Sequence, residues 1–96
     1  MKQSIIKDKS YAFAIRIIKF YSFLKDEKNE FVLSKQVLRS GTSIGAMVEE
    51  ALQAESQADF IHKLSVANKE ANETRYWIRL LKDTHFVESN LGDSMI

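Results

Sequence analysis

The stretch from Ser56 to Thr84 constrains the fold of this 96-residue chain more than any other. Its apolar and small residues recur four and three positions apart, at Phe60, Leu64, Ala67, Ala71, Thr74, Ile78 and Leu81. That spacing predicts one stripe of an α-helix, as in a heptad seam, whereas a strand would alternate by two. Ser56 and Asp59 match the S-x-x-D capping box, and Lys82 falls in the last turn, where the helix dipole favours a cation. Such a helix spans about 40 Å, so the other elements must pack along it.

The composition favours long helices in one domain covering residues 1–96. The chain has no proline and only three glycines, and these two residue types are the main helix breakers. It also has no cysteine, which excludes disulfides, thiol chemistry and cysteine-based zinc sites and is consistent with a cytoplasmic protein. The most apolar region, residues 11–24, is interrupted by Arg16 and Lys19. These charges argue against a membrane span, and no continuous apolar signal segment occurs at the N-terminus.

The first of two further helices is expected at about residues 9–28, after a frayed polar lead-in at residues 1–8. This helix is apolar around most of its circumference, with Phe13 and Phe20 on one face. A different face carries Tyr11, Ile15 and Ile18. A helix of this kind must be covered on several sides.

The second helix is expected at about residues 34–55, with Ser34 as its N-cap. In the turn before it, Phe31 and Val32 are expected to plug the end of the bundle. Gly41 and Gly45 lie four apart in its middle, although each costs about 1 kcal/mol relative to alanine. We interpret them as a point where a neighbouring helix backbone approaches closely, by small-xxx-small logic. The alternative is a smooth surface that a phosphate backbone or a ligand touches.

After residue 84 the sequence offers only a polar turn, residues 88–94, which resembles the approach to another helix that does not follow. The expected fold is therefore all-α, an antiparallel up-down bundle of three long helices at 9–28, 34–55 and 56–84, with a fourth helix missing or truncated. Three helices with this much apolar surface are under-covered. Either a fourth helix has been lost or partner copies cover the surface, so we expect a homo-oligomer.

Charge is distributed unevenly along the chain, although the formal net charge is only +1. Residues 1–40 hold nine basic and four acidic side chains, or +5, whereas residues 41–96 hold five basic and nine acidic ones, or −4. The candidate phosphate-binding residues are Lys9, Arg16, Lys19, Lys35 and Arg39. Phosphate contacts of this kind would bind RNA or DNA in a salt-dependent way, and without a base-reading motif they would show little sequence preference. The alternatives are a solvated helix surface and an attraction between the two halves.

Three segments resemble a known family: KSYAFAIRIIKFYSFL (9–24), LSKQVLRSGTSIGAMVEEALQAES (33–56) and DFIHKLSVANKEANETRYWIRLL (59–81). They are similar to the four-helix bundle proteins first recognised as products of intervening sequences inside bacterial large-subunit ribosomal RNA genes. The resemblance covers nearly the whole chain. It implies antiparallel four-helix bundles that assemble into pentameric rings. A related group, the accessory variability determinant proteins of diversity-generating retroelements, forms positively charged rings proposed to hold nucleic acid and a reverse transcriptase.

The chain departs from this family at two places. Serine stands at Ser34, where the family usually has a proline at or next to this position, and the chain ends where the family continues into a fourth helix. The resemblance carries no catalytic residues. Glu50, Glu70 and Glu73 fall inside its motifs, and we interpret them, with Trp77, Gly41 and Gly45, as assembly determinants. The carboxylates would pair with Arg39, Lys69 or an arginine of a neighbouring chain, because buried ion pairs can fix register.

Metal and enzyme chemistry find little support in the sequence. Di-iron bundles use two Glu-x-x-His motifs, and the nearest match is a single Asp59-x-x-His62. No G-x-S-x-G elbow and no G-x-x-x-x-G-K loop occurs. We therefore expect no metal site, no cofactor and no enzymatic activity. The predicted function is a non-enzymatic, oligomer-forming bundle that binds RNA or DNA nonspecifically through one basic face. The alternative is a structural scaffold with no nucleic-acid role, whose open groove holds a partner helix.

Overall fold

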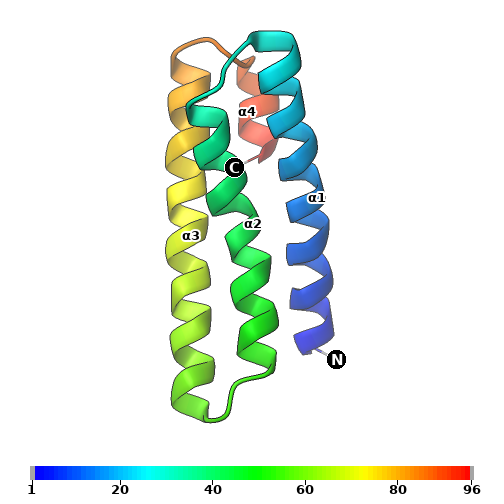
Figure 1. Cartoon of the computed structure of the whole chain (residues 1–96), viewed down its shortest axis with the longest axis vertical. Coiled ribbons are helices and arrows are strands. Elements are labelled where there is room, and N and C mark those ends of the chain that lie inside the picture. Colours follow the sequence, from blue (N-terminus) through cyan, green and yellow to red (C-terminus); the bar gives the residue numbers. More distant parts are fainter. Residues whose placement is uncertain (1, 96) are drawn as a thin grey trace.

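The computed structural model describes the backbone of residues 2–95 and the side chains of residues 5–95. In chain order the helices are α1 (Lys2–Lys28), α2 (Leu33–Leu52), α3 (Gln57–Asp83) and α4 (Ser89–Met95) (Figure 1). They form an elongated bundle of 43 × 20 × 19 Å. The predicted all-α bundle with a truncated fourth helix is confirmed. Within residues 2–95 no helix is both long and apolar enough to cross a bilayer.

The middle helix of the bundle is α2. Both α1 and α3 pack against it, and α4 packs against α3, while no Cα atom of α1 approaches one of α3 within 8 Å over the described helices. Figure 1 shows α4 at the end of the bundle that also holds the C-terminal turns of α1 and α3. Because α4 is so short, the opposite end of the bundle has three helices rather than four.

The size of the buried core also differs between the two ends of the bundle. We call the end with α4 the closed half: residues 17–28, 33–41, 74–87 and α4. We call the other end the open half: residues 5–14, 44–52 and 57–71. Ile17, Leu24, Val37, Ile78 and Leu81 are fully buried in the closed half, where Val87 and Met95 complete the cluster. In the open half the buried apolar side chains are smaller: Val48, Ala51 and Ala67.

The predicted seam of α3 is observed. Its buried residues are Ala67, Thr74, Ile78 and Leu81, all of them seam positions. The Ser56 hydroxyl accepts the Asp59 backbone N–H at 3.0 Å, which confirms the serine half of the capping box. The seam residues of the open half, such as Phe60 and Leu64, are only half-buried.

The predicted bounds of the first two helices need correction. The expected frayed lead-in is wrong for residues 2–8, which are the first turns of α1. Nothing in that segment breaks a helix, because it contains neither glycine nor proline. At the other boundary, α2 ends at Leu52 rather than near residue 55, and Ala54 and Ser56 lie in the link to α3.

The N-cap predicted at Ser34 is also wrong. Ser34 lies inside α2 and is fully buried, and the capping position falls at Val32, which makes no side-chain bond. Glu30 supplies the missing acceptor instead, because its Oε1 receives the Ser34 backbone N–H at 2.6 Å. The Ser34 hydroxyl donates in return to the Glu30 carbonyl at 2.8 Å. Asn29, with φ 53°, turns the chain out of α1 through the left-handed region that asparagine tolerates.

Phe31 and Val32 do not plug the end of the bundle. They are 52% and 71% exposed, respectively. Val87 is buried at that end, and Leu33 and Phe86 pack against the same cluster. Val87 and Phe86, on the turn between α3 and α4, therefore cover part of the bundle end in place of Phe31 and Val32. The two exposed side chains stay in solvent on the loop between α1 and α2.

The expectation that no helix follows residue 84 is corrected by α4. Three contacts hold this short helix: Met95 is buried, Gly92 packs on the Lys82 side chain, and Asp93 pairs with Lys82 at 3.0 Å. The Arg16 guanidinium of α1 also reaches its end, 3.4 Å from the Ser94 carbonyl and 3.3 Å from the Met95 sulfur. A seven-residue helix has little intrinsic stability, so these tertiary contacts explain why local sequence signals did not reveal it.

Candidate interaction surfaces

An apolar stripe follows the outer side of α1. Tyr11, Ile15 and Ile18 are 65%, 42% and 49% exposed, and their spacing of four and three places them on one face of the helix. Beside the stripe, Tyr11 and Ala14 meet Thr42, Gly45 and Ala46 of α2 around a shallow groove of about 310 Å³. We call this surface the α1–α2 face. It is one of the several faces of α1 that the apolar pattern predicts must be covered.

Gly41 and Gly45 lie where α1 and α2 approach closely. A Cβ atom at Gly41 would sit 2.7–2.8 Å from side-chain carbons of Ile17. One at Gly45 would lie 3.3 Å from the Ser10 carbonyl oxygen, so this glycine admits the α1 backbone. The packing interpretation of the two glycines is confirmed. Their part in assembly stays a prediction, because the observed contacts lie within one chain.

The carboxylates predicted to pair with Arg39 do so within the chain. The Arg39 guanidinium lies 3.4 Å from Glu70 Oε1 and also pairs with Glu73, which joins α2 to α3. Glu73 accepts the indole N–H of Trp77 at 3.1 Å. These pairs are part-exposed rather than buried, so each stabilises the fold by about 0–1 kcal/mol.

Glu50 is not part of that group. It pairs with Lys63 at 2.9 Å, nearer the link between α2 and α3. The hydrogen bond to Glu50 and its negative charge raise the pKa of Lys63 above its ordinary value of 10.5. Sequence reasoning missed this partner of Glu50. It also missed a buried hydrogen bond in which the hydroxyl of Thr74, the polar residue of the α3 seam, donates to the Ser40 hydroxyl at 2.8 Å.

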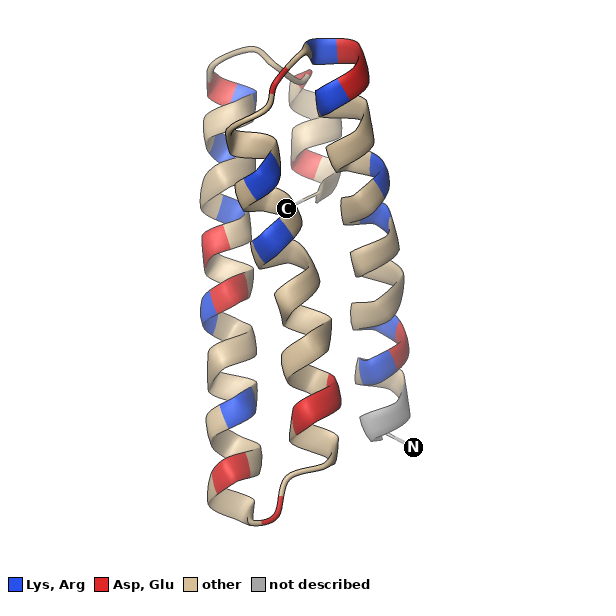
Figure 2. Cartoon of the chain, in the orientation of Figure 1, with Lys and Arg blue, Asp and Glu red and all other residues tan. Residues whose placement is uncertain are grey.

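The five candidate phosphate-binding residues are all exposed but do not form one surface. Arg16 reaches α4, whereas Arg39 is bound to carboxylates of α3. Figure 2 shows the cations of α1 and those of α2 as separate groups. Within the described side chains no ion pair joins Lys9, Lys19 or Lys35 to an acidic residue. The structure therefore divides the predicted basic face into an α1 group, Lys9, Arg16 and Lys19, and an α2 group, Lys35 and Arg39.

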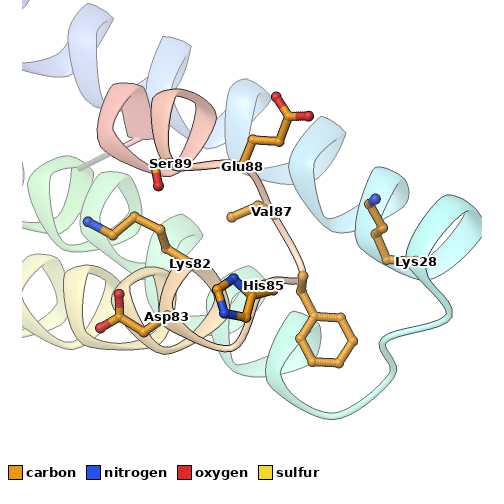
Figure 3. A pocket seen from close by; sticks show the side chains of 8 residues that line it. Lys28, Lys82, Asp83, His85, Val87, Glu88 and Ser89 are labelled. Atoms are coloured by element: carbon orange, nitrogen blue, oxygen red, sulfur yellow. The ribbon is translucent and has the colours of Figure 1, made fainter.

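A cavity of about 590 Å³ lies at the closed end beside the turn between α3 and α4. Figure 3 shows His85 and Val87 on this turn and Lys28 on the neighbouring α1. Lys82 at its edge is already bonded to Asp93. Over residues 5–95 no group of three histidine, cysteine, aspartate or glutamate side chains comes together as a metal site would require. His62, the histidine weighed as a ligand, is exposed on α3.

A further cavity, of about 190 Å³, begins at the C-terminal end of α4 and lies between α1 and α3. It is lined by Phe13, Ile44, Ala71, Thr74, Arg75 and Met95. We call it the open groove. Its position agrees with the open groove predicted between the first and third helices from a shortened fourth helix.

Comparison with known proteins matches a family model and solved structures. The family model described as 23S rRNA-intervening sequence protein matches residues 2–96. A crystal structure of a protein with unknown function from the S23 ribosomal protein family of Bacteroides thetaiotaomicron VPI-5482 is 56% identical, with a TM-score of 0.97. The match covers 99% of this chain and 85% of that one. No curated protein matches.

Proposed function

We propose that this chain, which belongs to the 23S rRNA-intervening sequence protein family, is a non-catalytic helical scaffold that self-associates. The α1–α2 face supports the proposal. Its stripe of Tyr11, Ile15 and Ile18 leaves large apolar side chains in water, and apolar area removed from water is worth about 25 cal/mol per Å². Contiguous apolar patches rimmed by polar residues are typical of protein interfaces.

We propose a second copy of the chain as the molecule that covers this face. The family resemblance implies pentameric rings, and a ring requires that one face of each copy binds a different face of the next. The α1–α2 face would be one of these two surfaces. We place the assembly in the cytoplasm, with which the absence of cysteine is compatible.

The molar mass of the purified chain tests the proposal. We expect light scattering to give a multiple of the 11.1 kDa chain mass. Ile15→Glu places a charge in the middle of the stripe and should lower the mass to that of one chain, with unchanged helicity by circular dichroism. Val32→Glu is the matched control, because Val32 is an exposed apolar residue outside this face. A wild-type chain that is monomeric at all concentrations would refute self-association.

The α1 group of cations favours a second candidate function, nonspecific binding of RNA or DNA. Lys9, Arg16 and Lys19 are exposed on one flank of α1, and an oligomer would repeat them in every copy. Each phosphate contact made by such residues contributes a salt dependence of about −0.7 to −0.9 in log K against log salt.

A fluorescence titration with generic RNA at two salt concentrations tests this second function. We expect binding at low salt that weakens steeply at high salt, and a further loss in the Lys9→Glu/Lys19→Glu double variant. Lys69→Glu, an exposed lysine on α3, is the control. Absence of binding at low salt would leave the scaffold without a nucleic-acid role.

A further inference from the structure

We propose that a pocket between α1 and α4 receives a base of a single-stranded nucleic acid, while the phosphates of that strand bind the α1 group of cations. This inference rests on the second candidate function, nonspecific binding of RNA or DNA, and adds the form of nucleic acid and the side chain on which a base stacks. It depends on three features: an apolar pocket beside α4, a half-buried aromatic ring in its wall, and cations along one flank of α1.

The pocket lies where α4 runs beside α1 without close packing (Figure 1). No Cα atom of α4 approaches one of α1 within 8 Å over the described helices, so only side chains span the space between them. Phe20 and Phe23 of α1 and Leu91 and Met95 of α4 form an apolar lining around about 330 Å³. Ligand sites typically enclose about 300–1,000 Å³. Met95 closes the lower end beside Arg16, so the pocket lies alongside α4, between the levels of Leu91 and Met95.

Phe23 presents an aromatic ring in the wall of this pocket. It is half-buried and packs against the core cluster that contains Phe20. One side of the ring is therefore fixed by packing, and the remainder is accessible from the pocket. The Lys28 ammonium lies 5.7 Å from the ring centroid, and this exposed lysine can move aside for a base and then bind a phosphate. Aromatic side chains held in this way are the platforms on which proteins stack unpaired bases.

Cations follow the same flank of α1 in the direction away from the closed end. Arg16 and Lys19 line the pocket, and Lys9 lies seven residues, or about two turns, before Arg16. In the other direction Glu27 lies about one turn beyond Phe23, where its charge repels a phosphate. The strand therefore runs from Phe23 toward Lys9, and its phosphates release counterions as they bind these residues.

The pocket favours an unpaired base over other anionic ligands. In a duplex the base faces are stacked on one another, so only the cations of α1 would take part in binding. A helical segment of an acidic protein would present several apolar side chains, whereas a pocket of this size has room for a single planar group next to two cations. We therefore argue for a single strand, and an acidic peptide becomes an outcome of the test.

Three labelled nucleic acids of about 12 nucleotides test the proposal, a length within the site sizes of known single-strand binders. They are a single-stranded RNA, the same strand with abasic sugars, and the corresponding duplex. We expect fluorescence anisotropy at low salt to show that the chain binds the single strand about tenfold more tightly than the abasic strand, because stacking adds to equal phosphate contacts. Equal affinities would overturn the pocket and leave nonspecific phosphate binding standing. If none of the three binds, nonspecific nucleic-acid binding is itself refuted, and this inference with it.

Phe23→Leu locates the base. It keeps an apolar side chain in the pocket but removes the ring, so the affinity for the single strand should fall about tenfold, to that of the abasic strand. Affinities for the abasic strand and the duplex should not change.

Tyr21→Leu is the matched control for Phe23→Leu. Tyr21 is also half-buried and also has a lysine near its ring, with the Lys25 ammonium 5.4 Å from the centroid. Two residues correspond to about 200° around an α-helix, so Tyr21 lies away from the pocket, and its replacement should leave the preference for bases intact. An equal loss in the two variants would overturn the assignment to the pocket.

A spectroscopic readout covers the case in which Phe23→Leu fails to fold. Phe23→Trp in a Trp77→Phe background places the only indole of the chain in the pocket. At saturation we expect the single strand to quench its fluorescence through stacking, and the abasic strand to leave it unchanged. Quenching by both strands, or by neither, would overturn stacking at this position.

Two glutamate-rich peptides test the competing occupant, one with a single phenylalanine and one with alanine in its place. Both should compete for the cations alone and therefore displace the single strand to the same extent. A phenylalanine peptide that competes about tenfold better, with this advantage lost in Phe23→Leu, would make an acidic protein segment the occupant of the pocket and would overturn the proposal.

Discussion

The two halves of the bundle share the three long helices, yet only the half that also contains α4 has a well-filled core. Along α1, the residues of one seam recur at alternating steps of four and three: Ile6, Ser10, Phe13, Ile17, Phe20 and Leu24. In the closed half Ile17, Phe20 and Leu24 are buried. In the open half Phe13 is half-buried and Ile6 is nearly half exposed.

Burial in this protein therefore depends on how many helices surround a residue, and the period of the sequence does not determine it alone. Where α4 is present, four elements surround the seam and large side chains fill it. Where α4 is absent, only α1, α2 and α3 are present, and one side of the same seam remains in water. An apolar periodicity thus identifies a face, whereas the topology decides whether that face becomes core or binding surface.

The largest effect is expected when a matched pair of substitutions on the α1 seam compares the two halves. Leu24→Ala removes a fully buried side chain from the closed half and should lower the free energy of unfolding by about 2–5 kcal/mol. Ile6→Ala in the open half should cost less than about 1 kcal/mol, because Ile6 is already in contact with water. Urea unfolding of both variants measures the difference. Equal costs would show that the open half is covered in solution.

The glycines provide a second comparison across the boundary between the halves. Gly41→Ala places a methyl group against the buried Ile17 side chain and should cost about 1–3 kcal/mol, reduced by the higher helix propensity of alanine. Gly45→Ala meets Ser10, whose carbonyl oxygen lies at 3.3 Å and whose hydroxyl lies at 3.6 Å, so the gain in propensity should roughly cancel this milder crowding. Thermal unfolding of the two variants is the measurement. A larger loss at Gly45 would contradict the assigned contacts.

A smaller effect is expected at the ion pairs between α2 and α3. Glu73→Gln keeps the shape of the side chain but removes its charge beside Arg39, and should cost at most about 1 kcal/mol. The cost should shrink in about 1 M salt, where charges are screened. If Glu73 also determines assembly, the variant will change the molar mass or the stability of the oligomer. An unchanged mass would restrict Glu73 to a role inside the bundle.

The smallest effect concerns Lys63, whose pKa is raised by Glu50. A raised pKa means that the pair stabilises the fold at pH values below the ordinary lysine value of 10.5, and that this contribution is lost as the pH rises through the higher folded value. In Glu50→Gln the pKa of Lys63 should return toward its ordinary value, as an NMR titration of the lysine side chain would show. A value that does not move would exclude Glu50 as the cause.

Most of the long-helix architecture was predictable from the sequence. The seam of α3 and the Ser56 cap each follow from a local pattern with a single physical reading, and the close approach at Gly41 was the favoured of two readings. The missed features depend on distant contacts. Burial of Met95 and packing of Gly92 on Lys82 stabilise α4, and the cap of α2 comes from Glu30, outside the helix. No local signal encodes these contacts.

The candidate surfaces were predictable to different degrees. The stripe of Tyr11, Ile15 and Ile18 was recognised because a helix apolar on several sides must be covered. The pairing of Arg39 with Glu70 and Glu73 was recognised as one of several options. The basic residues were wrongly treated as one surface, because helical spacing places side chains on their own helix and does not show which neighbour they face.

The central position of α2 has a kinetic consequence. Every pair of described helices whose Cα atoms approach within 8 Å, α1 with α2, α2 with α3 and α3 with α4, is also consecutive in the chain. Each hairpin therefore closes through a short loop and requires no distant segment, and such low contact order is associated with folding in microseconds to milliseconds. We therefore expect that either long hairpin can form before the remaining helix docks on it.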